Sequence, residues 1–178
     1  ILNESLSKVD ATIFGSRTLA AHKSTYLIKD HDSKISNKQP ISIVAGNTKK
    51  FSFSWPYFKQ PIQRWSVSSI NNKAITNREF NKQIFFQGNW ESILIELKHE
   101  GINSLALLGG SQLIYSFALE NLIDEIQITF IPKLIGGKYS WIPPIDQSKL
   151  FHINQTWKIK SVKTLSSHEI LINYVKSI

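Results

Sequence analysis

Short apolar runs that end in glycine or in small polar residues recur along the chain, and each of them predicts a β-strand. The predicted strands cover residues 11–14, 41–44, 64–69, 83–86 and 105–108. Segments whose apolar residues return at helical spacing lie between several of these runs. This order of strands and helices is typical of a mostly parallel sheet with helices on its faces.

Helix signals precede or follow several of the strands. Residues 1–8 predict the end of a helix, and a short helix is expected from Thr18. Asn89 is a good N-cap for a helix whose apolar residues recur at positions 90, 93, 94 and 97, and Gly101 is a natural stop. A further helix is expected over residues 111–120, directly after the last of the apolar runs.

The C-terminal part of the chain predicts antiparallel strands. Residues 126–131 alternate between apolar and polar, and residues 157–163 and 169–175 indicate a hairpin joined near Ser166 and Ser167. We expect this hairpin at a mixed edge of the sheet. No internal repeat or second domain is visible, so residues 1–178 are predicted to form one α/β domain.

Composition narrows the class of protein. Apolar residues make up 42% and charged residues 19% of the chain, as in ordinary soluble globular proteins. No segment approaches the roughly 18 apolar residues of a membrane span, so no membrane partner is expected. The absence of cysteine excludes disulfides and thiolate chemistry and accords with a reducing cytoplasm, where we expect the protein. Methionine is also absent, so some N-terminal sequence is expected to precede these residues.

The formal net charge of +8 comes from one window. Between Asp32 and Glu79 there is no acidic residue, whereas there are eight basic ones: Lys34, Lys38, Lys49, Lys50, Lys59, Arg64, Lys73 and Arg78. The window is open to three interpretations: a solvated surface, a site for an anionic ligand such as a phosphorylated cofactor, or a nucleic-acid surface. Nucleic acid is the remote alternative, and it rests on the aromatic residues among the charges, Trp55, Tyr57, Phe58 and Trp65.

Three of the apolar runs end in residues that suit a bound phosphate. They are residues 14–18 (FGSRT), 44–48 (VAGNT) and 107–111 (LLGGS). In open α/β sheets ligands bind beyond the carboxyl ends of the strands, where glycine lets a phosphate approach the backbone and the next helix offers N–H groups. A tight turn is the simpler explanation of any one junction. Together with the basic window, the junctions indicate an extended anion such as a dinucleotide.

Other catalytic signatures are absent from the sequence. It contains no G-x-x-x-x-G-K-[ST], no G-x-G-x-x-G and no G-x-S-x-G motif. The five histidines show no metal-ligand spacing, so no metal site is predicted, although His22 follows the first glycine junction and is a candidate to face a ligand. We identify no catalytic acid or base. This suits hydride transfer, in which a cofactor supplies the chemistry and the protein positions it.

Residues 107–137 resemble the C-terminal reductase domain of bacterial riboflavin-biosynthesis deaminase–reductases. That family shows an apolar strand, two glycines, a helix, Leu-x-Asp-Glu, a strand, Pro and a final Gly-Gly. In this sequence these are Gly109–Gly110, residues 122–125, Pro132 and Gly136–Gly137. Residues 9–29 are similar to the family's Asp-Ala…Gly-x-[Gly]-Thr segment. The resemblance covers nearly the whole chain and is closest to stand-alone members that lack the deaminase half.

The resemblance implies a dihydrofolate-reductase-like three-layer α/β fold, NADPH as cofactor, a homodimer, and reduction of the ribosyl group of a phosphorylated aminopyrimidine. It places a first set of residues at the cofactor phosphates: Gly15, Ser16, Arg17 and Thr18. A second set is expected at the pyrophosphate and ribose from the other side: Gly109, Gly110, Ser111, Gln112 and Leu113. Gly46 and Asn47 are expected near the adenosine end. From charge alone, Lys49 and Lys50 are candidates for the 2′-phosphate.

Departures from the family pattern concern the substrate. Leu108 stands where the family often has Glu, and dihydrofolate reductases tolerate an aliphatic residue there. The turn at His22–Thr25 replaces an Asp-containing turn, and Lys29 stands at an Arg position. The family's first strand has no counterpart in these residues. The substrate-side candidates are His22, Thr25, Lys29 and Leu108, and dihydrofolate reductase or a reductase of another small heterocycle remains the alternative function.

Overall fold

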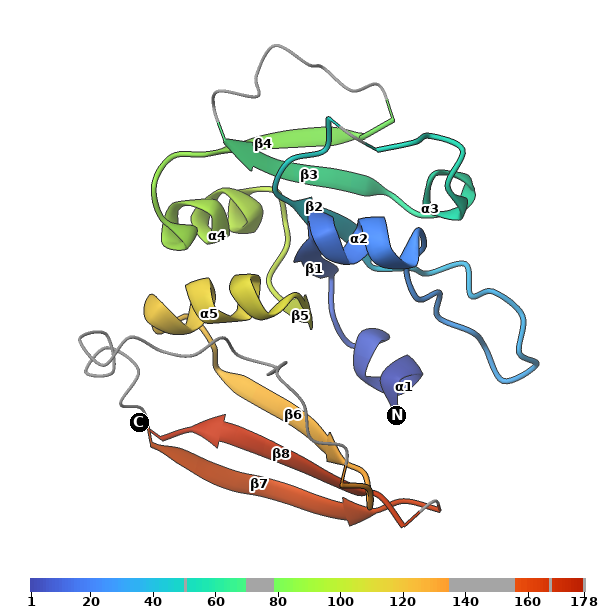
Figure 1. Ribbon diagram of the computed structural model, residues 1–178, viewed down its shortest axis with the longest axis vertical. Helices are drawn as coiled ribbons and strands as arrows, with labels where there is room; N and C mark the ends of the chain where they lie inside the picture. Colours follow the sequence, from blue (N-terminus) through green and yellow to red (C-terminus); the bar gives the residue numbers. More distant parts are fainter. Residues whose placement is uncertain (50, 70–78, 135–155, 167, 178) are drawn as a thin grey trace. The chain divides into compact units, whose positions relative to one another are not determined.

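A computed structural model describes residues 1–49, 51–69, 79–134, 156–166 and 168–177 (Figure 1). The described chain divides into two compact units, Ile1–Ile114 and Tyr115–Ile178. The first contains a parallel sheet with its helices, and the second an antiparallel sheet. Gly136, Gly137, Lys50, Lys73 and Arg78, which were singled out above, lie outside the described residues.

Five parallel strands form the sheet of the first unit, in the order β4-β3-β2-β1-β5. Each strand matches one of the predicted apolar runs to within one residue at either end. Their bounds are Ala11–Gly15 (β1), Ile41–Ala45 (β2), Arg64–Ser69 (β3), Lys82–Phe86 (β4) and Leu105–Gly109 (β5). The predicted parallel sheet is therefore confirmed, and β1, the first strand made, lies inside it between β2 and β5.

The helices are α1 (Leu2–Leu6), α2 (Ser16–His22), α3 (Pro56–Lys59), α4 (Trp90–His99) and α5 (Ser111–Leu119). The predicted N-cap of α4 is confirmed, because the Asn89 side chain accepts a hydrogen bond from the Ser92 N–H at 2.9 Å. Helix α2 begins two residues before the expected Thr18, directly at the end of β1. Helix α3 was not predicted; its four residues are too few to show a helical repeat, although Pro56 at its start is a known first-turn residue.

Aromatic side chains from the basic window form part of the core. Tyr57 and Phe58 pack with Phe14, Leu19 and Val44 in one buried cluster, and the Tyr57 hydroxyl lies 3.1 Å from that of Ser42. Trp65 on β3 is only 7% exposed. Nucleic-acid bases stack on exposed rings, and these three rings are turned inward. Most of the aromatic support for the nucleic-acid interpretation is therefore lost.

The second unit contains β6 (Glu125–Phe130), β7 (Trp157–Thr164) and β8 (Ile170–Lys176). The predicted hairpin is confirmed as β7 and β8, which pair antiparallel. Its position differs from the mixed edge expected from the sequence, because β6 pairs with the other side of β8 and the three strands form a sheet of their own in the order β6-β8-β7. Among the described strands, β1 to β5 pair only in parallel.

Candidate functional site

The carboxyl ends of three neighbouring strands meet at one edge of the parallel sheet. β1 pairs on one side with β2, where Gly15 is level with Ala45, and on the other with β5, where Phe14 is level with Gly109. The strand order therefore brings together the three glycine junctions that the sequence places far apart. We call this set the glycine edge: Gly15–Thr18, Gly46–Asn47 and Gly109–Leu113.

Gly46 follows β2 in a conformation that favours glycine. Its φ is +117°, and a Cβ added there would lie 2.7 Å from the Ser16 hydroxyl oxygen. Its N–H donates to the Val67 carbonyl at 2.8 Å, which holds the turn against β3. The end of β2 and the start of α2 are thus in direct contact, and a side chain at Gly46 would displace Ser16.

Gly109 and Gly110 both have positive φ, +120° and +94° respectively. Two successive residues in this region bend the chain sharply from β5 into α5, and glycine adopts it at the lowest cost. A Cβ at Gly110 would lie 3.1 Å from Thr18 Oγ1 and 3.8 Å from the Gly15 nitrogen. The backbone at Gly110 therefore approaches the β1–α2 turn closely, which explains why one glycine would not be enough.

Two helices begin at this edge. Gly15 is the N-cap of α2, and it has no side chain with which to cap the first turn. On the other side, the Gly110 carbonyl accepts from Leu113 N and Ile114 N at 2.8 and 3.0 Å and so opens α5. The first N–H groups of a helix have no partner within the helix and carry a partial positive charge. The arrangement offers backbone donors from both sides of β1 to an anion, where a Cβ at Gly46 or Gly110 would intrude.

Cationic side chains accompany the turns. Arg17 and Lys49 are exposed, and the Asn47 carboxamide oxygen accepts from Lys49 N at 2.9 Å, which shapes the turn after β2. The turn lies within the acid-free window, so its own residues carry no carboxylate. An anionic ligand at the glycine edge would meet attraction from these groups.

Leu108 occupies an irregular position. The pairing of β1 with β5 shifts between Ile13 and Phe14, so Ile13 is level with Leu107 but Phe14 with Gly109, and Leu108 is the extra residue of this bulge. Its half-buried side chain packs against the core cluster that contains Phe14 and Leu19. Leu108 therefore supports the core beneath the glycine edge, a role that the sequence did not suggest.

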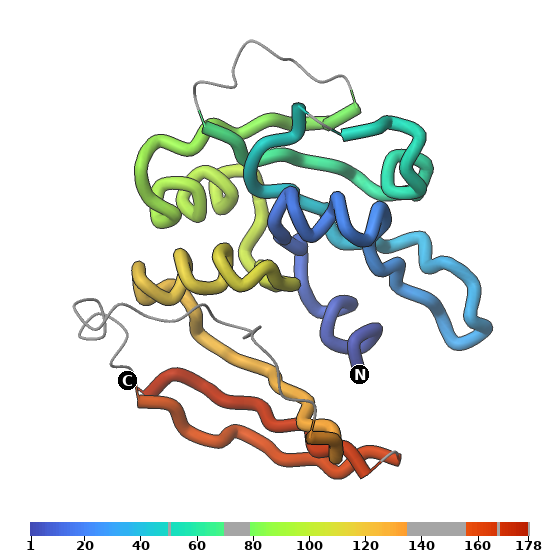
Figure 2. Tube along the Cα trace, viewed as in Figure 1, coloured from blue at the N-terminus to red at the C-terminus, as the bar shows by residue number. Residues whose placement is uncertain are grey.

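Of the other substrate-side candidates, His22 is the last residue of α2, and Thr25 and Lys29 belong to the long connection from α2 to β2 (Figure 2). His22 is exposed at the end of α2. Thr25 is held by Gln60, whose side chain accepts from Thr25 N at 3.0 Å and donates to Thr25 O at 2.7 Å. The backbone of Lys29 bonds the Asn3 side chain, beside α1. Among the described contacts, none joins Lys29 to the glycine edge, and its role stays a prediction.

Sequence reasoning missed Gln60 and Lys23, whose hydrogen bonds hold the chain that follows α2 in place. Lys23 ends α2 with a φ of +58°, and its carbonyl accepts from Tyr57 N at 3.0 Å. These contacts join segments more than thirty residues apart. No local pattern in the sequence signals them.

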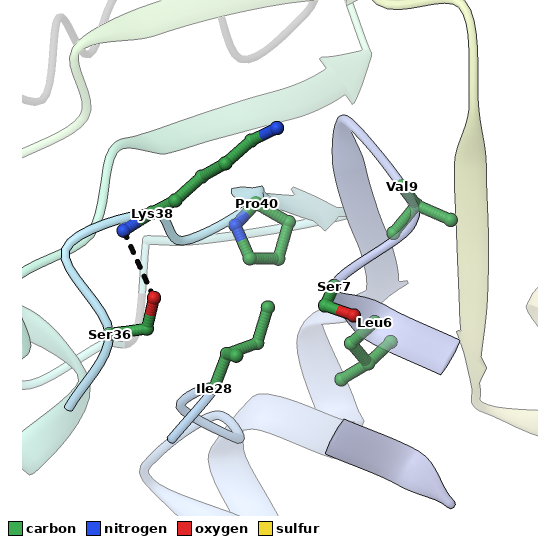
Figure 3. Close-up of a pocket in the computed structure, with 7 residues that line it drawn as sticks. All are labelled: Leu6, Ser7, Val9, Ile28, Ser36, Lys38 and Pro40. Carbon is green, nitrogen blue, oxygen red and sulfur yellow. Dashed lines mark hydrogen bonds between the residues drawn. The ribbon is translucent and has the colours of Figure 1, made fainter. Parts of the chain in front are cut away.

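A small cavity of about 140 Å³ lies at the amino ends of β1 and β2, away from the glycine edge (Figure 3). Ligand pockets for molecules of drug size measure about 300–1,000 Å³, so this cavity is too small for a dinucleotide. The residues that line it are mostly apolar: Leu6, Ser7, Val9, Ile28, Ser36, Lys38 and Pro40.

The amino ends of β1 and β5 are tied by one carboxylate. Asp10 Oδ2 accepts from Ser104 Oγ at 2.8 Å and from the backbone N–H groups of Asn103 and Ser104 at 2.9 Å. These hydrogen bonds, with the Ser104 hydroxyl first, lower the pKa of Asp10 below its usual value. A side-chain carboxylate thus links β1 and β5 at the amino end of the sheet, whereas glycines follow the strands at its carboxyl end.

No cluster of His, Cys, Asp and Glu among the described residues has the form of a metal site. No helix in the described part of the chain is long and apolar enough to cross a membrane.

Comparison with known proteins identifies the family. The family model of the RibD C-terminal domain matches residues 1–171. The chain belongs to the RibD C-terminal domain family. The riboflavin biosynthesis protein RibD of Actinobacillus pleuropneumoniae is 33% identical over 96 residues, which are 53% of this chain and 24% of that protein. The sequence resemblance described above is therefore confirmed, and the matched part is about a quarter of that relative's length.

Solved structures of RibD proteins have a similar fold. Acinetobacter baumannii RibD aligns with a TM-score of 0.79 and 16% identity, over 99% of this chain and 49% of that one. A diaminohydroxyphosphoribosylaminopyrimidine deaminase/5-amino-6-(5-phosphoribosylamino)uracil reductase from Thermotoga maritima aligns with a TM-score of 0.78 and 16% identity, over 99% and 48% of the two chains. The expected fold, that of the dihydrofolate-reductase-like reductase domain of RibD proteins, is confirmed by these likenesses.

Proposed function

We propose that residues 1–178 act as one reductase domain that uses NADPH. The main support is the approach of Gly110 to the β1–α2 turn, where an added Cβ would lie 3.1 Å from Thr18 Oγ1. This approach brings backbone donors together on both sides of β1, with the hydroxyl groups of Thr18 and Ser16 beside them, and such donors suit a bound pyrophosphate. A chain of the RibD C-terminal domain family with this glycine edge is best explained as an oxidoreductase.

NADPH, when bound, supplies the hydride. Gly15, Ser16, Arg17 and Thr18 would hold its phosphates from one side. The residues that would hold its pyrophosphate and ribose from the other side are Gly109, Gly110, Ser111, Gln112 and Leu113. Gly46 and Asn47 would lie at the adenosine end, because β2 is the next strand along the edge from β1. Lys49 would attract the 2′-phosphate, and the turn after β2 contains no carboxylate that would repel it.

The substrate we propose is a phosphorylated aminopyrimidine of riboflavin biosynthesis, whose ribosyl group is reduced. The name of the Thermotoga maritima relative includes such a reductase activity. Among the substrate-side residues, His22 is the exposed side chain nearest in sequence to the glycine edge, and Thr25 and Lys29 are candidates for the substrate phosphate. Leu108 would present an apolar surface where relatives often have Glu.

One observation favours a second substrate class. Leu108 packs into the core and brings no charge to the base of the glycine edge. A site without that carboxylate suits dihydrofolate or another small heterocycle as well as an aminopyrimidine. The second candidate function is therefore a dihydrofolate reductase or a related heterocycle reductase with the same cofactor.

We further propose that the protein works in the cytoplasm as a homodimer. Both proposals rest on the family resemblance, and the absence of cysteine accords with the first.

Titration with NADPH followed by a substrate panel tests the function. Binding is expected with a dissociation constant in the micromolar range, about −8 kcal/mol. NADPH oxidation is then measured with the phosphoribosylaminopyrimidine and with dihydrofolate. Turnover of the first supports the main proposal, and turnover of dihydrofolate alone favours the second. Failure to bind NADPH at millimolar concentration would contradict both.

A further inference from the structure

Residues 23–40 connect α2 to β2 without a helix or strand of their own. Connections of this length that lack secondary structure are usually either functional or disordered. The middle of this connection is held in place, because side chains from three different parts of the chain bond its backbone between residues 25 and 29. The reason for this order is sought in the side chains that the same residues carry.

Three side-chain carboxamides bond this backbone in the same way. A carboxamide has an oxygen that accepts and an NH2 group that donates, so it can bond both the N–H and the C=O of one residue, as a neighbouring antiparallel strand does. All six hydrogen bonds of this kind measure between 2.7 and 3.0 Å. We call the three side chains the carboxamide clamps: Gln60 on Thr25, Gln39 on Ile28 and Asn3 on Lys29.

The clamps belong to ordered parts of the first unit. Asn3 lies in α1, and Gln39 stands two residues before β2. Gln60 follows α3, and its backbone carbonyl accepts a hydrogen bond from Arg64 Nη1, on β3, at 2.9 Å. All three clamp side chains are half-buried. They therefore fix the connection to the helices and to the sheet.

The clamps bond only the backbone of the connection and leave two polar side chains unused. The Thr25 hydroxyl and the Lys29 ammonium group take part in no hydrogen bond or ion pair with the part of the chain that the structure describes. Thr25 is half-buried and Lys29 is exposed, whereas Ile28 between them is only 5% exposed. A hydroxyl group and an ammonium group on a fixed backbone are suitable donors for a phosphate.

We propose that the carboxamide clamps are positioning groups, which hold Thr25 and Lys29 in place for the phosphate of the substrate. The proposal rests on the proposed function, in which these two residues are the candidates for that phosphate. A segment that is ordered before the substrate arrives loses less conformational entropy on binding. The clamps act through the backbone and do not touch the substrate themselves.

Gln60→Met tests the clamp on Thr25. Methionine has a similar length and no charge, but it can neither accept from Thr25 N nor donate to Thr25 O. The KM for the phosphorylated aminopyrimidine is expected to rise roughly 10- to 100-fold, with kcat close to the wild-type value. The KM for the same compound without its phosphate, and the dissociation constant of NADPH, should not change. Gln63→Met is the matched control, because Gln63 is exposed and its side chain makes no described hydrogen bond.

Asn3→Leu tests the clamp on Lys29 from a different element, α1. It should raise the KM for the phosphorylated compound in the same selective way. A purely structural role of the clamps would lower the free energy of unfolding without distinguishing the phosphorylated compound from the dephosphorylated one. The ratio of the two KM values therefore separates positioning from stability, even where one of the variants folds poorly.

Amide hydrogen exchange of the wild-type protein without ligands checks the order of the segment directly. The N–H groups of Thr25, Ile28 and Lys29 should exchange slowly, because each donates to a carboxamide oxygen. Exchange at the rate of an open loop would overturn the proposal whatever the activity of the protein.

The kinetic outcomes distinguish this proposal from the function on which it rests. Wild-type protein that reduces no phosphorylated aminopyrimidine refutes the proposed function, and the role of the clamps falls with it. Wild-type turnover, together with clamp variants that change the KM values of both compounds equally or not at all, refutes the positioning role alone and leaves the proposed function standing.

Discussion

Gly110→Ala is the sharpest perturbation of the glycine edge. The added methyl group has two separable effects. At a φ of +94° the alanine backbone is strained by about 1–2 kcal/mol, which lowers the free energy of unfolding. The same methyl group projects toward Thr18 Oγ1 at 3.1 Å and occupies the space where the proposed pyrophosphate approaches the backbone.

The loss of NADPH affinity follows from the hydrogen bonds that the methyl group prevents. A hydrogen bond from a backbone N–H to a charged phosphate contributes about 1.5–3 kcal/mol. Loss of one such bond at about 2 kcal/mol weakens binding roughly 30-fold. Gly110→Asp adds a negative charge at the same point and is expected to abolish binding.

Gly101→Ala separates strain from occlusion. Gly101 has a φ of +86°, close to that of Gly110, and no described atom lies within 4 Å of a Cβ added there. Chemical denaturation of both variants should show a similar loss of stability, and fluorescence titration with NADPH should show weaker binding only for Gly110→Ala. If both variants bind NADPH equally well, the close approach of Gly110 to the β1–α2 turn has no part in cofactor binding.

Three further variants test other parts of the structure. Burial raises the pKa of Tyr57 to about 12 from 10.0. Because the folded state holds this proton more tightly than the unfolded state, the free energy of unfolding should fall as the pH rises from 10 to about 12, by at most about 1.4 kcal/mol per pH unit. Chemical denaturation of Tyr57→Phe over the same pH range should not show this fall. Asn89→Ala removes the cap of α4 and should lower the free energy of unfolding by about 1 kcal/mol, whereas Asn37→Ala, at an exposed loop position, should change it little. Lys49→Ala should weaken the binding of NADPH more than the binding of NADH. An unchanged ratio of the two dissociation constants would contradict a place for Lys49 in the 2′-phosphate site.

Strand positions were predictable because each strand is a compact apolar run with a break at its end. Ala11, Ile13 and Phe14 are almost fully buried, as a strand inside a parallel sheet should be. The four-residue helix α3 left no comparable trace. The arrangement of β6, β7 and β8 was harder to predict, because β8 pairs on both sides and its sequence does not say which strand is its second partner.

The residues of the glycine edge were predictable from strand ends rich in glycine, but their contacts were not. The approach of Gly110 to Thr18 depends on β5 lying beside β1, which is a property of strand order. The bulge at Leu108 depends on the register of the same pair. Local sequence does not encode either relation, so the sequence predicts only the substrate-side role of Leu108 and not its packing against the core.

The tie between Asp10 and Ser104 spans 94 residues of the chain. On a ribosome that adds about 5–20 residues per second, β1 must wait roughly 5–20 s before β5 exists to pair with it. Until then β1, which lies inside the finished sheet, has one unpaired edge. Unpaired strand edges can pair with other chains. The last step in completing the parallel sheet is therefore the closing of its longest loop, and expression at lower temperature or with a chaperone that covers nascent strands should raise the yield of folded protein.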